Sequence, residues 1–247
     1  MGETSAEKPI LSMVKPERGD KTTRLEAFVD AAFAFAVTLL VISGDHLPHS
    51  VDDLILALKS VPTFAASFWL ILVFWTAHAD WSRRYGLDDA ATRRLSMVLV
   101  FLVLIFVYPL RMVFSSLFDL VTHHWLPATF TIDTWRDVSA MFITYGVAFG
   151  ALCALMWMLF RHAWTCRDAL GLSREERIAA RMDQFRWAML GTVAIVSVLA
   201  AVLVLRVGSN AWGWKLGLPG FLYWGTALLG PLSRRYQHRL EAVETPA

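Results

Sequence analysis

The chain has 247 residues, of which 56% are hydrophobic and only 18% are charged, with a formal net charge of +2. Soluble domains contain about 45–50% apolar and about 25% charged residues, so this composition excludes an ordinary soluble domain. It predicts an integral membrane protein surrounded by membrane lipids, and the spans described below predict that this protein is all-α. We expect no nucleic acid among its partners.

The first 23 residues are polar and contain Pro9 and Pro16. They lack the apolar core of a cleavable signal peptide, so residues 1–23 are predicted to be a disordered cytoplasmic tail. The two cysteines also differ in setting, since Cys153 falls in an apolar stretch and Cys166 in a basic one. This arrangement predicts free thiols rather than a disulfide.

Residues 24–43 form the first predicted membrane span. At about 1.5 Å per residue this stretch is long enough to cross a hydrocarbon core of about 30 Å. An acid inside a span costs roughly 2.5–3.5 kcal/mol, so Asp30 is expected to face protein or water rather than lipid. At about 100° per residue, Asp30 points roughly 140° away from Phe35. An aromatic and aliphatic stripe, with Thr38 at its edge, is predicted at Phe28, Ala31, Phe35, Leu39 and Ile42.

Five further spans follow in the order of the chain. Pro62 is expected to kink the first turns of the second span. A Ser173-x-x-Glu176 pattern in the basic segment after the fourth span is typical of a capping box. The predicted spans are residues 52–81, 95–118, 137–161, 187–207 and 211–232.

The connecting segments alternate in charge. The N-terminal tail, the segments after the second and fourth spans, and the C-terminus are rich in Lys and Arg, whereas the other three loops contain few. Since basic loops stay in the cytoplasm, both termini are predicted to be cytoplasmic. The resulting organisation is a six-helix transmembrane domain over residues 24–233, with a cytoplasmic C-terminal tail over residues 234–247.

The first span also carries a sequence motif. Arg24-x-x-x-Phe28-x-Asp30, followed by an apolar run into Thr38-Leu39-Leu40, resembles the first helix of the transmembrane protein 175 family of endosomal and lysosomal potassium channels. The family motif has serine where this chain has Val29, and isoleucine or leucine where it has Phe35. Animal members of the family have two six-helix repeats and prokaryotic members have one. Because this chain has a single set of six predicted spans, the resemblance implies a prokaryotic-type subunit.

The resemblance implies a homotetramer in a prokaryotic inner membrane, with helix 1 lining a central pore. The activity it implies is a leak-type channel for potassium or other monovalent cations, with proton permeation as a further expectation. No cofactor, metal or enzyme activity is expected. The implied pore-lining and constriction residues are Phe35, Thr38, Leu39 and Ile42. The implied structural polar network consists of Arg24, Asp30, Trp75 and His78.

Simpler interpretations stay open for each of these residues. An apolar stripe is usually a packing face, a hydroxyl such as that of Thr38 commonly bonds back to its own helix, and Arg24 suits an ordinary membrane anchor. A buried histidine such as His78 is often a satisfied core residue. The histidines expected on the outer side lack a carboxylate or cysteine at metal-ligand spacing. These residues are His46, His49, His123 and His124.

Other functions also stay open. The sequence contains no TVGYG-like carbonyl filter, P-loop or nucleophile elbow. The resemblance implies that ion selectivity comes from side chains on a narrow pore rather than from backbone carbonyls. The alternative is a non-conducting membrane scaffold or a small secondary transporter, although broken helices and inverted repeats, which are typical of transporters, are not evident. A membrane enzyme is the third choice.

Overall fold

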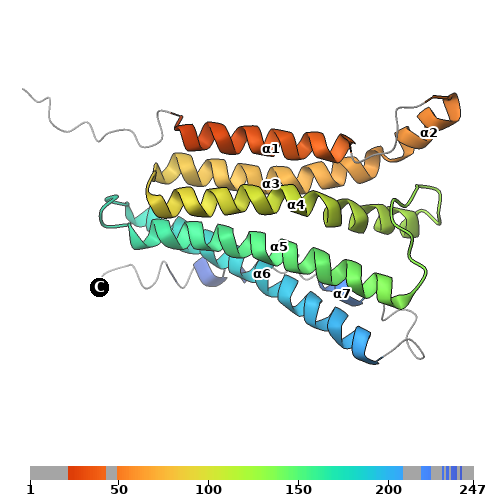
Figure 1. The fold of residues 1–247 in the computed structure, drawn as a ribbon. Coiled ribbons are helices and arrows are strands. Elements are labelled where there is room, and N and C mark those ends of the chain that lie inside the picture. Colours follow the sequence, from red (N-terminus) through yellow and green to blue (C-terminus); the bar gives the residue numbers. More distant parts are fainter. Residues whose placement is uncertain are drawn as a thin grey trace, which may run out of the picture.

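The computed structural model describes residues 22–42, 49–207, 218–223, 230, 232–233, 235–237 and 240. All regular structure in these residues is helical, and the long helices lie side by side as a bundle (Figure 1). The helices are α1 Arg24–Ile42, α2 Val51–Lys59, α3 Val61–Tyr85, α4 Ala90–Val121, α5 Trp135–Thr165, α6 Arg174–Val207 and α7 Leu218–Phe221.

Four stretches are long and apolar enough to cross a membrane: Val51–Tyr85, Ala90–Val121, Trp135–Thr165 and Arg174–Arg206. They correspond to the second to fifth predicted spans. Helix α1 lies beside them but carries Arg24, Glu26 and Asp30, and it is not among the four. Most of the sixth predicted span, residues 211–232, falls outside the described residues, as do residues 1–21 of the predicted tail. The count of six spans therefore stays a prediction.

The second predicted span consists of two helices rather than one kinked helix. Helix α2 begins with a capping box between Ser50 and Asp53 and ends at Ser60, where α3 starts with Pro62 in its first turn. Proline has no N–H, and its ring clashes with the carbonyl four residues earlier, so the α2 hydrogen-bond pattern cannot continue through Pro62. Helix α3 then ends at Gly86, whose φ of 58° is favourable for glycine.

The fifth predicted span starts too late in the sequence. Helix α6 begins at Arg174 and has 34 residues, which corresponds to about 51 Å. This length exceeds the hydrocarbon thickness of about 30 Å, so the basic residues before position 187 form helical turns outside the lipid. The predicted capping box starts this helix: the Ser173 amide donates to Glu176 Oε2 at 2.7 Å, and the Glu176 amide donates to Ser173 Oγ at 3.2 Å.

Aromatic side chains from four helices form the centre of the bundle. Phe74 of α3 packs edge-on against Phe106 of α4 and Phe149 of α5, with ring centroids 6.4 and 5.9 Å apart. The Phe74 ring also lies 5.3 Å from that of Trp187 on α6. The exposed fraction is at most 5% for each of Phe74, Phe106 and Phe149. Apolar burial and ring packing at this centre therefore hold the four helices α3, α4, α5 and α6 together.

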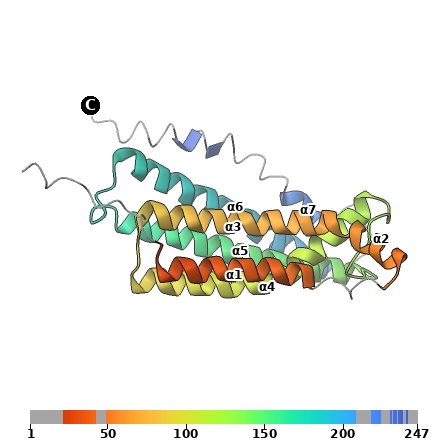
Figure 2. The ribbon, with the colours of Figure 1, turned by 90° about the horizontal axis from the view of Figure 1, so that it is seen from above.

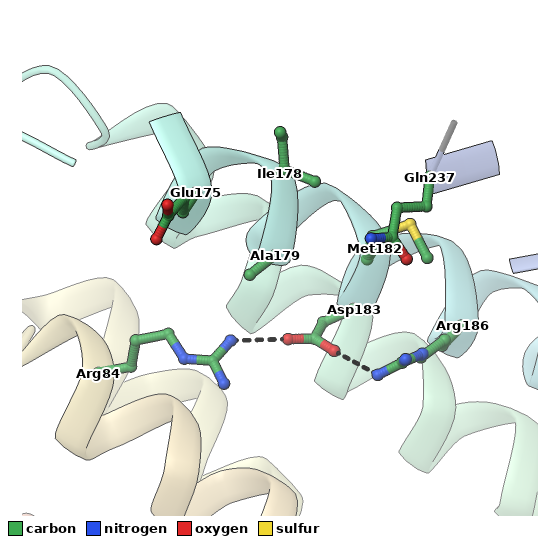
Figure 3. Close-up of a pocket in the computed structure, with 8 residues that line it drawn as sticks. All are labelled: Arg84, Glu175, Ile178, Ala179, Met182, Asp183, Arg186 and Gln237. Atoms are coloured by element: carbon green, nitrogen blue, oxygen red, sulfur yellow. Dashed lines mark hydrogen bonds and ion pairs between the residues drawn. The ribbon is translucent and has the colours of Figure 1, made fainter. Parts of the chain in front are cut away.

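The basic residues collect at one end of the bundle, where α1, α4 and α6 begin and α3 and α5 end (Figures 1 and 2). Arg84 of α3 donates to Asp183 of α6 at 2.9 Å, and Arg186 contacts the other oxygen of Asp183 at 3.2 Å (Figure 3). Nearby, the guanidinium groups of Arg167 and Arg181 lie 5.0 and 4.6 Å from the Trp164 ring. The ion pair thus links α3 to α6, and the cation–π contact of Arg181 links α6 to α5, at this end.

Candidate functional site

Helix α1 packs into the bundle with one face only. Its buried residues recur every three or four positions, which is the spacing of a single helix stripe. That stripe contacts α3 and α4. Each member is at most 9% exposed: Leu25, Val29, Phe33, Ala36 and Leu40.

No described part of the chain covers the opposite side of α1, and we call this side the exposed face of α1. Its two largest members, Phe28 and Phe35, are 53% and 54% exposed. Apolar surface of this size on a membrane helix contacts either lipid or another protein surface. The exposed face comprises Arg24, Ala27, Phe28, Asp30, Ala31, Ala34, Phe35, Thr38 and Val41.

The structure separates the residues that the sequence grouped as pore-lining. Phe35 and Thr38 both belong to the exposed face. Leu39 is half-buried and packs against the bundle core, so it lies at the margin of that face. The side chain of Ile42 is outside the described residues. The exposed face is therefore rotated about the helix axis relative to the predicted stripe. Thr38 lies well inside this face and Leu39 lies at its edge.

Thr38 donates its hydroxyl hydrogen to the carbonyl of Ala34 at 3.0 Å. A bond of this kind, from the hydroxyl back to its own helix, was the simpler interpretation of Thr38 from the sequence. A hydroxyl has one donor and two acceptor lone pairs, so the bond uses the hydrogen and leaves the oxygen able to accept. The back-bonded Thr38 is consequently still able to offer an oxygen to a cation on the exposed face.

Asp30 lies at the border of the exposed face nearest α3. The indole Nε1 of Trp75, on α3, donates to Asp30 Oδ1 at 2.8 Å. The pairing of these two residues was expected from the resemblance, but Asp30 is exposed rather than enclosed within the chain. A single indole bond leaves most of the carboxylate's acceptor capacity unused, so Asp30 needs water or a second copy of the chain beside it.

His78 follows Trp75 by one helical turn but contacts a different helix. It is 3% exposed, and its Nε2 lies 2.9 Å from the hydroxyl of Ser96 on α4. Trp75 and His78 therefore tie α3 to α1 and to α4, respectively. Arg24 is exposed at the start of α1, and no described side chain pairs with it, so its place in a polar network stays a prediction.

Two contacts near the site were missed in the sequence. Thr23 and Glu26 form a capping box at the start of α1, with the Thr23 amide donating to Glu26 Oε2 at 2.8 Å and the Glu26 amide to Thr23 Oγ1 at 3.1 Å. The Thr-x-x-Glu pattern was a readable signal. The contact between His78 and Ser96 had no such signal, because a serine at the start of an apolar span does not indicate which residue of another helix it contacts.

The part of the sequence that forms the helices of this site matches a known family model. Residues 24–109, which include α1, α3 and α4 as far as Pro109, match the model described as endosomal/lysosomal potassium channel TMEM175. The chain is also 27% identical over 215 residues to a potassium channel of Marivirga tractuosa, covering 83% of each protein. Over residues 24–109 the chain is therefore similar to the TMEM175 family.

Two solved structures are also similar to this chain. A crystal structure of a variant of the potassium channel MtTMEM175, bound to a nanobody fusion, is 25% identical and superposes with a TM-score of 0.76. The alignment covers 93% of this chain and 99% of that one. A homologue, from Chamaesiphon minutus, of the lysosomal potassium-selective channel TMEM175 has the same fold with 20% identity and a TM-score of 0.51. It covers 82% of this chain and 96% of that one.

Proposed function

We propose that this protein is a potassium-permeable channel in which the exposed faces of α1 from four identical subunits line a central pathway. The observation that carries the proposal is the exposed face itself. The same helix buries Val29 and Phe33 almost completely while Phe28 and Phe35 are more than half exposed. A helix that packs with one stripe and leaves two phenylalanines and a threonine uncovered fits a surface completed by other subunits.

Asp30 supports assembly over simple lipid contact. A carboxylate facing hydrocarbon costs roughly 2.5–3.5 kcal/mol, and the Trp75 indole provides only one hydrogen bond to it. Association of subunits through this region, or a water-filled path beside it, removes that cost. In a scaffold whose α1 faced lipid, the Asp30 carboxylate would keep this energetic cost, and no other interaction would offset it.

Phe35 and Thr38 suit the two parts of a pore formed by side chains, namely a narrow constriction and an oxygen that contacts the ion. Four Phe35 rings around a central axis leave little room for an ion, and a hydrophobic constriction also excludes water by dewetting. The Thr38 oxygen, with its hydrogen directed to Ala34, is available to replace part of an ion's water shell. Leu39 at the margin would extend the dry segment. Proton permeation stays a prediction.

The channel function is tested with purified protein in liposomes. A potassium gradient should drive a flux that empty liposomes lack, and the mass of the protein corrected for bound detergent should equal four chains. Flux with a tetrameric mass supports the proposal. A folded tetramer that passes no potassium favours the scaffold, and a flux that saturates and couples to a second solute favours a secondary transporter.

Membrane orientation gives a second expected result. We propose that the basic end of the bundle faces the cytoplasm of a prokaryotic cell, following the distribution of Lys and Arg. Each cysteine is introduced together with Cys166→Ser, because the native Cys166 is itself partly exposed at the basic end. In intact cells, a membrane-impermeant thiol reagent should then label Asp133→Cys, in the exposed loop between α4 and α5. It should label Asp88→Cys, at the basic end, only after the cells are permeabilised. Labelling of Asp88→Cys in intact cells, with Asp133→Cys protected, would reverse the orientation.

A further inference from the structure

Three metal-ligating side chains of different chemistry, none of them on α1, meet at the basic end of the bundle. Asp89, His162 and Cys166 each place one ligand atom so that these three atoms all lie within 4.8 Å of one another. Asp89 comes immediately before α4, whereas His162 is in the last turn of α5 and Cys166 ends that helix. The cluster therefore joins parts of the chain that are far apart in sequence.

The geometry points to a binding site for a divalent metal of the zinc class, and we propose that Asp89, His162 and Cys166 are its three protein ligands. Thiolate, imidazole and carboxylate are the donors that Zn²⁺ uses in proteins, and a site with three of them keeps a fourth position for water. A mixed set containing sulfur and nitrogen does not suit Mg²⁺ or Ca²⁺, which prefer oxygen ligands.

Hydrogen bonds already hold two of the ligands, Asp89 and His162, in place. Asp89 Oδ1 accepts from the Thr92 amide at 2.7 Å and caps α4, which leaves Oδ2 for the His162 ring at 2.6 Å. A metal bound to Oδ2 takes the place of the hydrogen between these two atoms, and the helix cap stays intact. His162 and Cys166 are four residues apart, so they lie one above the other along the same helix face.

Protons balance in the binding step. The metal bonds to His162 Nε2, and the ring then carries its proton on Nδ1. The Cys166 thiol releases its proton to water and binds as the thiolate, while the Asp89 carboxylate binds through Oδ2. The occupied site would cross-link the start of α4 to the end of α5.

The two cysteines of the chain make the site directly testable. Cys153 is fully buried, whereas Cys166 is partly exposed, so a thiol reagent added to the folded protein reports on Cys166. After treatment with a chelator, purified protein should bind one Zn²⁺ per chain, and Zn²⁺ should slow Cys166 alkylation by at least about tenfold. Co²⁺ bound instead should give a thiolate-to-cobalt absorption band that is lost in Cys166→Ser.

His162→Gln and Asp89→Asn keep hydrogen-bonding side chains in place but weaken or remove a ligand. Both should reduce Zn²⁺ affinity by at least about tenfold, the smallest loss usual even for residues that only support metal ligands. Asp88→Asn is the matched control, because Asp88 is adjacent in sequence but pairs with Arg93 at 3.3 Å. Unchanged Cys166 reactivity in Zn²⁺, or full protection in His162→Gln, would overturn the proposal. If a variant fails to fold, the stoichiometry and Co²⁺ spectrum of the unmodified protein decide the question.

Discussion

Shortening Phe35 to alanine should raise potassium flux through liposomes containing this protein by about an order of magnitude. In the proposed pathway, four Phe35 rings form the narrowest and driest point, and their removal lets water and ions pass. A tenfold change corresponds to lowering the barrier by about 1.4 kcal/mol. The wider opening should also weaken the preference for potassium over sodium. Both effects are measured with potassium and sodium gradients at equal amounts of reconstituted tetramer.

Phe33→Ala is the matched control for this experiment. Phe33 is on the same helix but is 3% exposed and packs into the bundle, so its truncation leaves a cavity. A buried Phe→Ala change costs about 3–5 kcal/mol of stability. The folded fraction should therefore decrease, without a higher flux per folded tetramer. Equal flux in unmodified protein and Phe35→Ala, both folded and tetrameric, would remove Phe35 from the pathway and favour the scaffold.

Replacing Asp30 with alanine should weaken assembly before it changes ion selectivity. The single chain leaves Asp30 exposed with one hydrogen bond from Trp75, so in the proposed tetramer burial of this region by a neighbouring subunit would offset a cost of roughly 2.5–3.5 kcal/mol in lipid. Alanine has no such cost, and the separated subunit then becomes relatively more stable. Detergent-corrected mass at decreasing protein concentration should detect dissociation of Asp30→Ala at concentrations where the unmodified protein stays assembled.

Two further variants separate the roles of Asp30. Trp75→Phe removes the indole donor but keeps an aromatic ring, so it should disturb α1 relative to α3 and reproduce part of the Asp30→Ala effect. Asp30→Asn retains an acceptor for the indole and should assemble better than Asp30→Ala. An intact oligomer of Asp30→Ala with lost selectivity would instead mean that the carboxylate faces the ion pathway.

Local sequence was sufficient for much of the helical framework. Four of the predicted spans correspond to membrane-length helical stretches because their apolar residues continue for longer than a hydrocarbon core requires. The boundaries were less predictable, since hydropathy marks where lipid ends and not where a helix ends. The start of α6 at Arg174 illustrates this difference, although the Ser173–Glu176 capping box was readable.

The sequence by itself determined that Asp30 needs a polar partner and that α1 carries the motif of a known channel family, because charge, length and residue order are local properties. Tertiary structure alone decided which side of α1 is covered, since this depends on how α3 and α4 pack against it. That packing buries Phe33, exposes Phe35 and brings Leu39 to the margin. It also joins His78 to Ser96 and gathers Asp89 with His162 and Cys166. Such contacts join separate helices, and no spacing within one helix encodes them.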